Sequence, residues 1–180
     1  MSRSGIAAVA SIACLVAIPS ATAEWSPPLL PTIAREAGSA AVSVHCLTVR
    51  EWSAGRLPNG SIVVRRGSAL LVTDHACSVL VGYATSFPHT PRAGTPAEFA
   101  VTSSLYRFLV AAVSRLHLNR GRADCRVLES FPPALTRLGA PSTTGAKKVL
   151  MRLLVARKRL HLEVRPSSRC PVKLPKAAPS

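Results

Sequence analysis

AEFAVTSSLYRFLVAAVSRLHL, residues 97–118, is the longest periodic segment of the chain. Its apolar residues recur at helical spacing and form one stripe, which predicts an amphipathic helix that buries this stripe. The stripe consists of Phe99, Leu105, Phe108, Leu109, Ala112, Val113 and Leu116. The Asn-Arg-Gly sequence that follows is expected to end the helix, with Gly121 just beyond its last turn. We therefore expect this segment to be the core helix of the fold.

Two strands and a helix are predicted before the core helix. Residues 41–49 alternate branched with smaller or polar residues, and residues 61–67 follow the Asn59-Gly60 turn signal, so the two runs favour a β-hairpin. Arg65 and Arg66 at the end of the second run are typical of an edge strand, where charge opposes pairing with other chains. Residues 73–86 predict a helix that begins at Thr73 or Asp74. Ahead of these elements, the proline-rich residues 26–32 suggest an extended arm, and residues 33–40 that follow it are expected to form one or two helical turns.

Helices also dominate the predicted C-terminal part. Residues 122–131 predict a short helix that Pro132-Pro133 stops. Residues 146–160 predict a basic amphipathic helix, and residues 160–164 a short strand. The expected fold class is therefore α+β and mainly helical, with a β-hairpin, a central core helix and a basic C-terminal helix.

The first 23 residues have the pattern of a secretory signal peptide. One cation, Arg3, precedes an apolar run from Ile6 to Ile18, and Ala21-Thr22-Ala23 provides a small-residue cleavage site. We expect cleavage after Ala23 to leave residues 24–180 as a single secreted, extracellular domain with a proline-rich C-terminal tail. The alternative is a membrane anchor retained as an uncleaved signal, but the run is shorter than the ~20 residues of a spanning helix. No transmembrane segment is predicted after the signal.

Four cysteines remain after cleavage, at Cys46, Cys77, Cys125 and Cys170. An even number in an exported chain favours two disulfides, for which three connectivities exist. The alternative is a zinc site, suggested by His45 beside Cys46 and by His75 near Cys77, with His117 and His161 as further ligands. Structural zinc sites use closely spaced ligand pairs such as Cys-x-x-Cys, and the chain has none. We therefore expect disulfides and no metal.

The chain is strongly basic, with 23 Lys and Arg against 8 Asp and Glu and a formal net charge of +15. Ten of the basic residues lie between Lys147 and Lys176, where Glu163 is the only acid. Such a field attracts anionic partners, here anionic lipid or a cell-wall polymer. Aromatic residues make up only 4% of the chain, so a base-stacking surface for specific nucleic acid binding is not expected. The predicted anion-binding residues are Lys147, Lys148, Arg152, Arg157, Lys158 and Arg159. The alternative is a solvated basic surface with no partner.

No catalytic motif is present in the sequence. A Gly-x-Ser-x-Gly elbow and a glycine-rich phosphate loop are both absent, so no catalytic residues and no cofactor are predicted. Asp74 adjoins His75, but neighbouring residues of a helix point about 100° apart and form no dyad by themselves. The alternative is a secreted hydrolase whose site assembles in space from Asp74, His75 and His117.

The order of the four cysteines, with Ala123-Asp124-Cys125 and a last cysteine in a proline-rich tail, resembles a family of small secreted actinobacterial proteins. These HExxH metallopeptidase-like proteins carry a metal-binding helix ahead of a similar Ala-Asp-Cys sequence. Counting back from Cys125, the two histidines of that motif fall on Leu109 and Val113, and its glutamate falls on Val110.

None of these three side chains binds zinc or activates a water molecule. The resemblance therefore implies a pseudoenzyme, a scaffold of the family without its metal ligands. It also implies the pairing of the cysteines, which would join Cys46 to Cys77 and Cys125 to Cys170.

Overall fold

The computed structural model describes residues 28–38, 43–85, 92–114 and 116–175, so the predicted signal peptide lies outside the described residues. Over these residues the helices are α1 (Leu29–Glu36), α2 (Val49–Ala54), α3 (Asp74–Thr85), α4 (Pro96–Val113), α5 (Arg120–Arg137) and α6 (Thr143–Ala156). The strands are β1 (Ser43–Leu47), β2 (Val63–Arg66) and β3 (Ala69–Thr73). The expected α+β, mainly helical class is confirmed.

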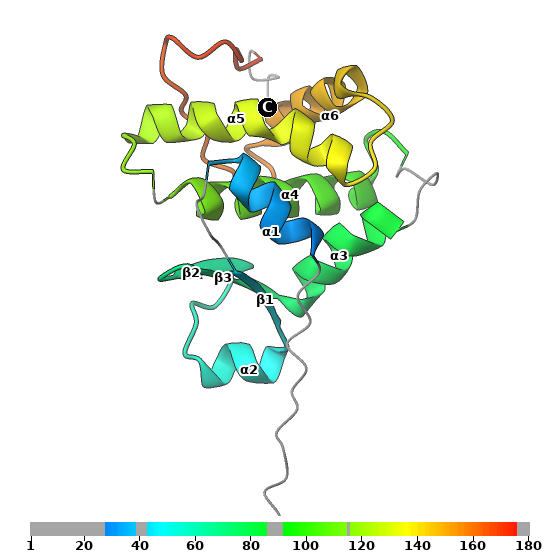
Figure 1. Ribbon diagram of the computed structural model, residues 1–180. Helices are drawn as coiled ribbons and strands as arrows, with labels where there is room; N and C mark the ends of the chain where they lie inside the picture. The colour runs from blue at the N-terminus through cyan, green and yellow to red at the C-terminus, as the bar shows by residue number, and fades with distance from the viewer. Residues whose placement is uncertain (1–27, 39–42, 86–91, 115, 176–180) are drawn as a thin grey trace, which may run out of the picture.

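α4 is the central element of the fold (Figure 1). The small sheet lies on one side of it and α5 and α6 cover the opposite side, while α1 and α3 pack against it as well. Thr95 starts the helix, since its hydroxyl accepts a hydrogen bond from the Glu98 N–H at 3.3 Å, and Pro96 occupies the first helical position. The central residues of the predicted stripe, from Leu105 to Val113, are fully buried, which confirms the core helix.

The hairpin is present, but its strands differ from the expected ones. β2 pairs antiparallel with β3, which the sequence pattern missed, and β1 pairs in parallel with the other edge of β3. The Asn59-Gly60 turn does not join β1 to β2, because α2 lies between them. The capping box of Thr48 and Glu51 starts α2. β2 is an edge strand, as Arg65 and Arg66 predicted.

α1 and α5 both include prolines that were expected to prevent a helix. α1 begins at Leu29, inside the predicted extended arm, and accommodates Pro31 in its first turn, where the missing N–H is not needed. α5 runs 18 residues through Pro132-Pro133 instead of stopping there. Interruption of a helix by proline costs about 3 kcal/mol. Burial of Phe131, Leu135 and other apolar side chains on the same face outweighs this cost.

The junction between α4 and α5 also differs from the expectation. α4 ends at Val113 rather than near residue 118, and Asn119 caps α5 by accepting a hydrogen bond from the Arg122 N–H at 3.0 Å. Gly121 therefore begins a helix instead of ending one. A Cβ atom at Gly121 would stand 3.1 Å from the Ser167 nitrogen, so glycine allows the C-terminal segment to approach α5.

The C-terminal segment, residues 157–175, contains no strand, in contrast to the prediction for residues 160–164. It crosses the first half of α5, where the Arg165 N–H donates to the Asp124 carboxylate at 2.6 Å and the Ser167 N–H to the Gly121 carbonyl at 2.9 Å. Within the predicted strand, the N–H groups of Leu160, His161 and Leu162 donate to carbonyls of residues 156–158 at the end of α6 and in the turn that follows it, so they are not available for strand pairing.

Two disulfides join distant parts of the chain. Cys46 of β1 is bonded to Cys77 of α3, with their Cα atoms 6.0 Å apart. Cys125 of α5 is bonded to Cys170 of the C-terminal segment, with their Cα atoms 5.5 Å apart. The structure thus has the pairing that the family resemblance implies.

Candidate functional site

α6 carries three of the six residues predicted to bind anions, and its sequence gives it one buried face. The helix ends at Ala156, before the predicted end at residue 160, so Arg157, Lys158 and Arg159 lie in the turn that follows it. Ser142 starts the helix by accepting a hydrogen bond from the Gly145 N–H at 3.0 Å. The buried face packs on the core and consists of Ala146, Leu150, Leu153 and Leu154. The opposite face is left to solvent.

That outer face combines cations with exposed apolar side chains. At about 100° per residue, Lys147, Met151 and Val155 lie within one quarter of the helix circumference. Met151 is 40% exposed and Val155 is 48% exposed, although most large apolar residues of this chain are buried. Three exposed lysines border the pair, and we define the α6 patch as Lys147, Lys148, Met151, Val155 and Lys158.

The arginines predicted to bind anions have other contacts. Arg152 donates two hydrogen bonds to the carboxylate of Glu98, whose residue is only 6% exposed, so its charge is paired inside the fold. Arg157 donates to the Leu154 carbonyl at 2.5 Å, and the guanidinium of Arg159 lies 5.1 Å from the ring centroid of Phe99. Arg159 remains exposed beside the α6 patch. The lysines of the patch form no ion pair with described residues.

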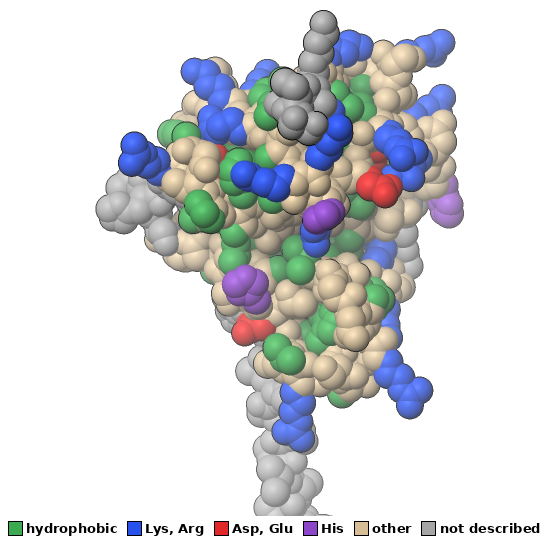
Figure 2. All heavy atoms as spheres, turned by 180° about the vertical axis from the view of Figure 1, so that it is seen from behind, with side chains coloured by type: hydrophobic (Ala, Val, Ile, Leu, Met, Phe, Trp, Pro, Cys, Tyr) green, Lys and Arg blue, Asp and Glu red, His purple; other side chains and the backbone are tan. Residues whose placement is uncertain are grey.

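Positive charge extends over much of the molecular surface. Figure 2 shows Lys and Arg side chains over much of the helical part on one face, with few acidic side chains among them. Two further acids are neutralised in ion pairs, Glu36 with Arg137 and Glu163 with Arg120. α6 itself contains no acidic residue, so the α6 patch has no acidic neighbour on its own helix.

The alternative hydrolase site is only partly assembled. Asp74, His75 and Ser78 line one cavity of about 670 Å³ beside α2, but the lining of this cavity does not include His117. The side chains of Asp74, His75 and Ser78 are exposed, and no hydrogen bond joins His75 to Asp74 or to Ser78. A nucleophile and its base need such a hydrogen bond, so this arrangement does not form a catalytic dyad as it stands.

Within the described ranges, no three His, Cys, Asp or Glu side chains gather closely enough to hold a metal ion. His45 approaches the Ser43 hydroxyl at 3.1 Å. At the positions aligned with the metallopeptidase motif, Leu109 and Val113 are buried in the core and Val110 is partly exposed.

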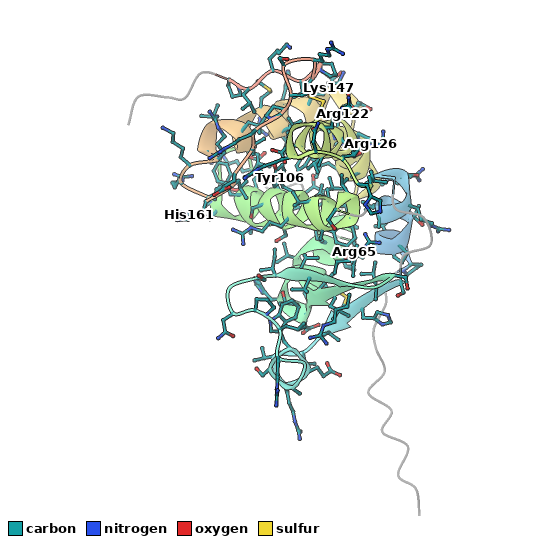
Figure 3. The ribbon with its side chains drawn as sticks, turned by 90° about the vertical axis from the view of Figure 1, so that its left-hand side faces the viewer. Arg65, Tyr106, Arg122, Arg126, Lys147 and His161 are labelled. Atoms are coloured by element: carbon teal, nitrogen blue, oxygen red, sulfur yellow. A yellow bond between two sulfur atoms is a disulfide. The ribbon has the colours of Figure 1, made fainter. Side chains whose placement is uncertain are left out.

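Tyr106 is a feature that the sequence did not single out. It projects from α4 toward α5 (Figure 3), is 2% exposed, and its hydroxyl is the only buried side-chain polar atom among the described residues without a hydrogen-bond partner. Burial, together with the negative charge of Asp124, raises the pKa of Tyr106 above its usual value. The phenol is therefore neutral and keeps an unused proton. No local sequence pattern signals this, because the partner is missing only in three dimensions.

We expect Tyr106→Phe to raise the free energy of unfolding of the ligand-free protein by about 1 kcal/mol. The substitution removes an unpaired buried hydroxyl and keeps the ring, and an unsatisfied buried polar group costs about 1–3 kcal/mol. Chemical denaturation of both proteins measures the difference. A destabilised variant would mean that a bound water molecule satisfies the hydroxyl.

Comparison of the chain with protein-family models, curated proteins and solved structures found no match. Among the helices of the described residues, none combines the length and the apolar character needed to cross a bilayer.

Proposed function

We propose that this is an exported, non-catalytic protein that binds an anionic lipid surface through the α6 patch. One observation carries the proposal: Met151 and Val155 are exposed on α6 beside three lysines without an ion pair, two of them on the helix and Lys158 just beyond its end. Helices that lie in a membrane interface place apolar side chains below the headgroups and lysines beside them. The signal-like N-terminus and the two disulfides support export, since disulfides persist in oxidising compartments.

Anionic lipid is favoured over a cell-wall polymer because of the apolar pair. A soluble polyanion would bind the lysines but would gain little from Met151 and Val155. An acyl region buries both side chains, and each square ångström of apolar area removed from water contributes about 25 cal/mol. The lysines attract the surface before this contact forms, and their attraction weakens with salt.

The double substitution Lys147→Gln/Lys158→Gln is expected to weaken binding to vesicles of mixed phosphatidylcholine and phosphatidylserine about thirtyfold. Each lysine near an anionic membrane contributes about 1 kcal/mol, and about 1.4 kcal/mol corresponds to a factor of ten. Co-sedimentation with the vesicles measures the partition. The matched control is Arg35→Gln/Arg50→Gln, which removes two exposed cations from α1 and α2 and should change binding much less. Equal losses of vesicle affinity in the two double variants would mean that the net charge of the protein, and not the α6 patch, determines binding.

A second pair of variants separates lipid from polymer. Met151→Ser/Val155→Ser keeps every charge of the α6 patch, so it should weaken vesicle binding and leave binding to a soluble polyanion such as heparin unchanged. Retention of full vesicle affinity by this variant would contradict insertion of the apolar pair. Binding to heparin but not to the vesicles would favour a wall polymer.

A further inference from the structure

A second site is formed beneath the C-terminal segment, away from the α6 patch. A cavity of about 650 Å³ lies between α4, the start of α5, the loop before β2 and residues 161–163. This volume falls in the range of small-molecule sites. Tyr106, Asp124 and His161 belong to its lining, and Figure 3 labels Tyr106 on α4 and His161 in the C-terminal segment.

The residues that line the cavity are partly polar and partly apolar, and their positive and negative charges are equal in number. Arg107 and Arg120 stand against Asp124 and Glu163. Apolar surface comes from β2 and its preceding loop and from the outer side of α4, where Val110 is 41% exposed. A charged ligand would meet two like charges, whereas a neutral ligand with apolar surface meets no such penalty.

The unpaired Tyr106 hydroxyl restricts which functional group the ligand carries. The neutral phenol needs an acceptor. The carboxylate of Asp124, which lines the same cavity, accepts only, and one of its oxygens already accepts from the Arg165 N–H. A carbonyl would satisfy Tyr106 but would offer Asp124 nothing, and an ammonium would leave the phenolic proton unused. A hydroxyl group accepts from one and donates to the other.

We propose that this cavity binds a carbohydrate, with one sugar hydroxyl accepting from Tyr106 and donating to Asp124. The C–H face of a pyranose suits the apolar side of the cavity at Val110. Further hydroxyls find partners at the rim, where Ser61, Ser114 and His161 are located.

Access to Tyr106 requires movement at the rim. The Tyr106 hydroxyl itself has no solvent contact. The ion pair of Arg120 and Glu163 lines the same cavity, and its side chains are 56% and 72% exposed. Exposed ion pairs contribute little to stability, so a sugar displaces this one at low cost.

The test is an NMR titration of the ¹⁵N-labelled, disulfide-bonded chain. The probes are methyl glucoside, methyl mannoside, N-acetylglucosamine and, as a monohydroxylic comparison, cyclohexanemethanol. We expect saturable shifts of the amides of Ser61, Val110 and Ala123 with at least one sugar. Tyr106→Phe should weaken that binding about tenfold, the effect of one hydrogen bond.

Two further variants complete the design. Tyr83→Phe is the matched control, because Tyr83 is half-buried at a different cavity, and it should bind the sugar as the unsubstituted protein does. Val110→Trp fills the cavity from a partly exposed position and should abolish the shifts without touching Tyr106. Absence of saturable shifts with every sugar, equal affinity in Tyr106→Phe, or binding of cyclohexanemethanol alone would overturn the proposal.

Discussion

Removal of the Cys125–Cys170 disulfide by Cys125→Ala/Cys170→Ala is expected to lower the free energy of unfolding by about 4 kcal/mol. The bond closes a loop with a sequence separation of 45, and loops of this length lose about that much unfolded-state entropy when they are cross-linked. Small domains are stable by only about 5–15 kcal/mol, so the loss is a large fraction of the total. Urea denaturation of the two proteins measures this loss. The variant should show a lower urea concentration at the midpoint of unfolding, with the same dependence of the free energy on urea concentration.

The same substitution should loosen the C-terminal segment first. Apart from the disulfide, this segment is held by the hydrogen bonds of Arg165 and Ser167 to α5 and by the exposed pair of Arg120 and Glu163. Leu162 and Val164 also bury their side chains in the core. Trypsin should therefore cut after Arg169 much faster in the variant, whereas Pro166 blocks cleavage after Arg165 in both proteins. An unchanged urea midpoint together with unchanged cleavage after Arg169 would show that the segment stays in place without the disulfide.

Arg152→Met is expected to destabilise the protein by about 2–3 kcal/mol. Glu98 is 6% exposed and its carboxylate accepts from the Gly94 N–H at 2.7 Å and from two nitrogens of Arg152. Methionine keeps much of the apolar stem but leaves a buried carboxylate with one backbone hydrogen bond, and a broken buried pair costs several kcal/mol. We expect a smaller loss than for a fully buried pair because the Arg152 side chain is 36% exposed.

The matched control is Arg137→Met, which breaks the pair with Glu36. Its side chains are 50% and 38% exposed, and exposed ion pairs contribute little, so stability should hardly change. The double substitution Glu98→Gln/Arg152→Met should recover part of the loss, because it removes the uncompensated charge. Equal losses for Arg152→Met and Arg137→Met would contradict a special role for the buried carboxylate.

The sequence by itself determined the elements whose information is local. The apolar stripe from Leu105 to Val113 predicted the core helix, because a 3.6-residue period allows a helix to bury one face. Of the two residues predicted to start α3, Thr73 and Asp74, Thr73 is the cap, because its hydroxyl accepts a hydrogen bond from the Ala76 N–H at 3.3 Å. The pairing of the cysteines also agrees with the structure, although it was inferred from a family resemblance and not from the residues alone.

Only the tertiary structure decided the features that depend on distant partners. α5 continues through Pro132-Pro133 because its apolar face is buried in the core, and this burial outweighs an unfavourable local preference. The parallel pairing of β1 with β3 joins segments separated by α2 and β2, so no local pattern reveals it. The same is true of the candidate sites. Periodicity identified the buried face of α6, but the exposure of Met151 and Val155 and the unpaired hydroxyl of Tyr106 depend on what other elements cover. Local sequence fixes which backbone conformation is favourable, whereas packing decides which side chains remain without a partner.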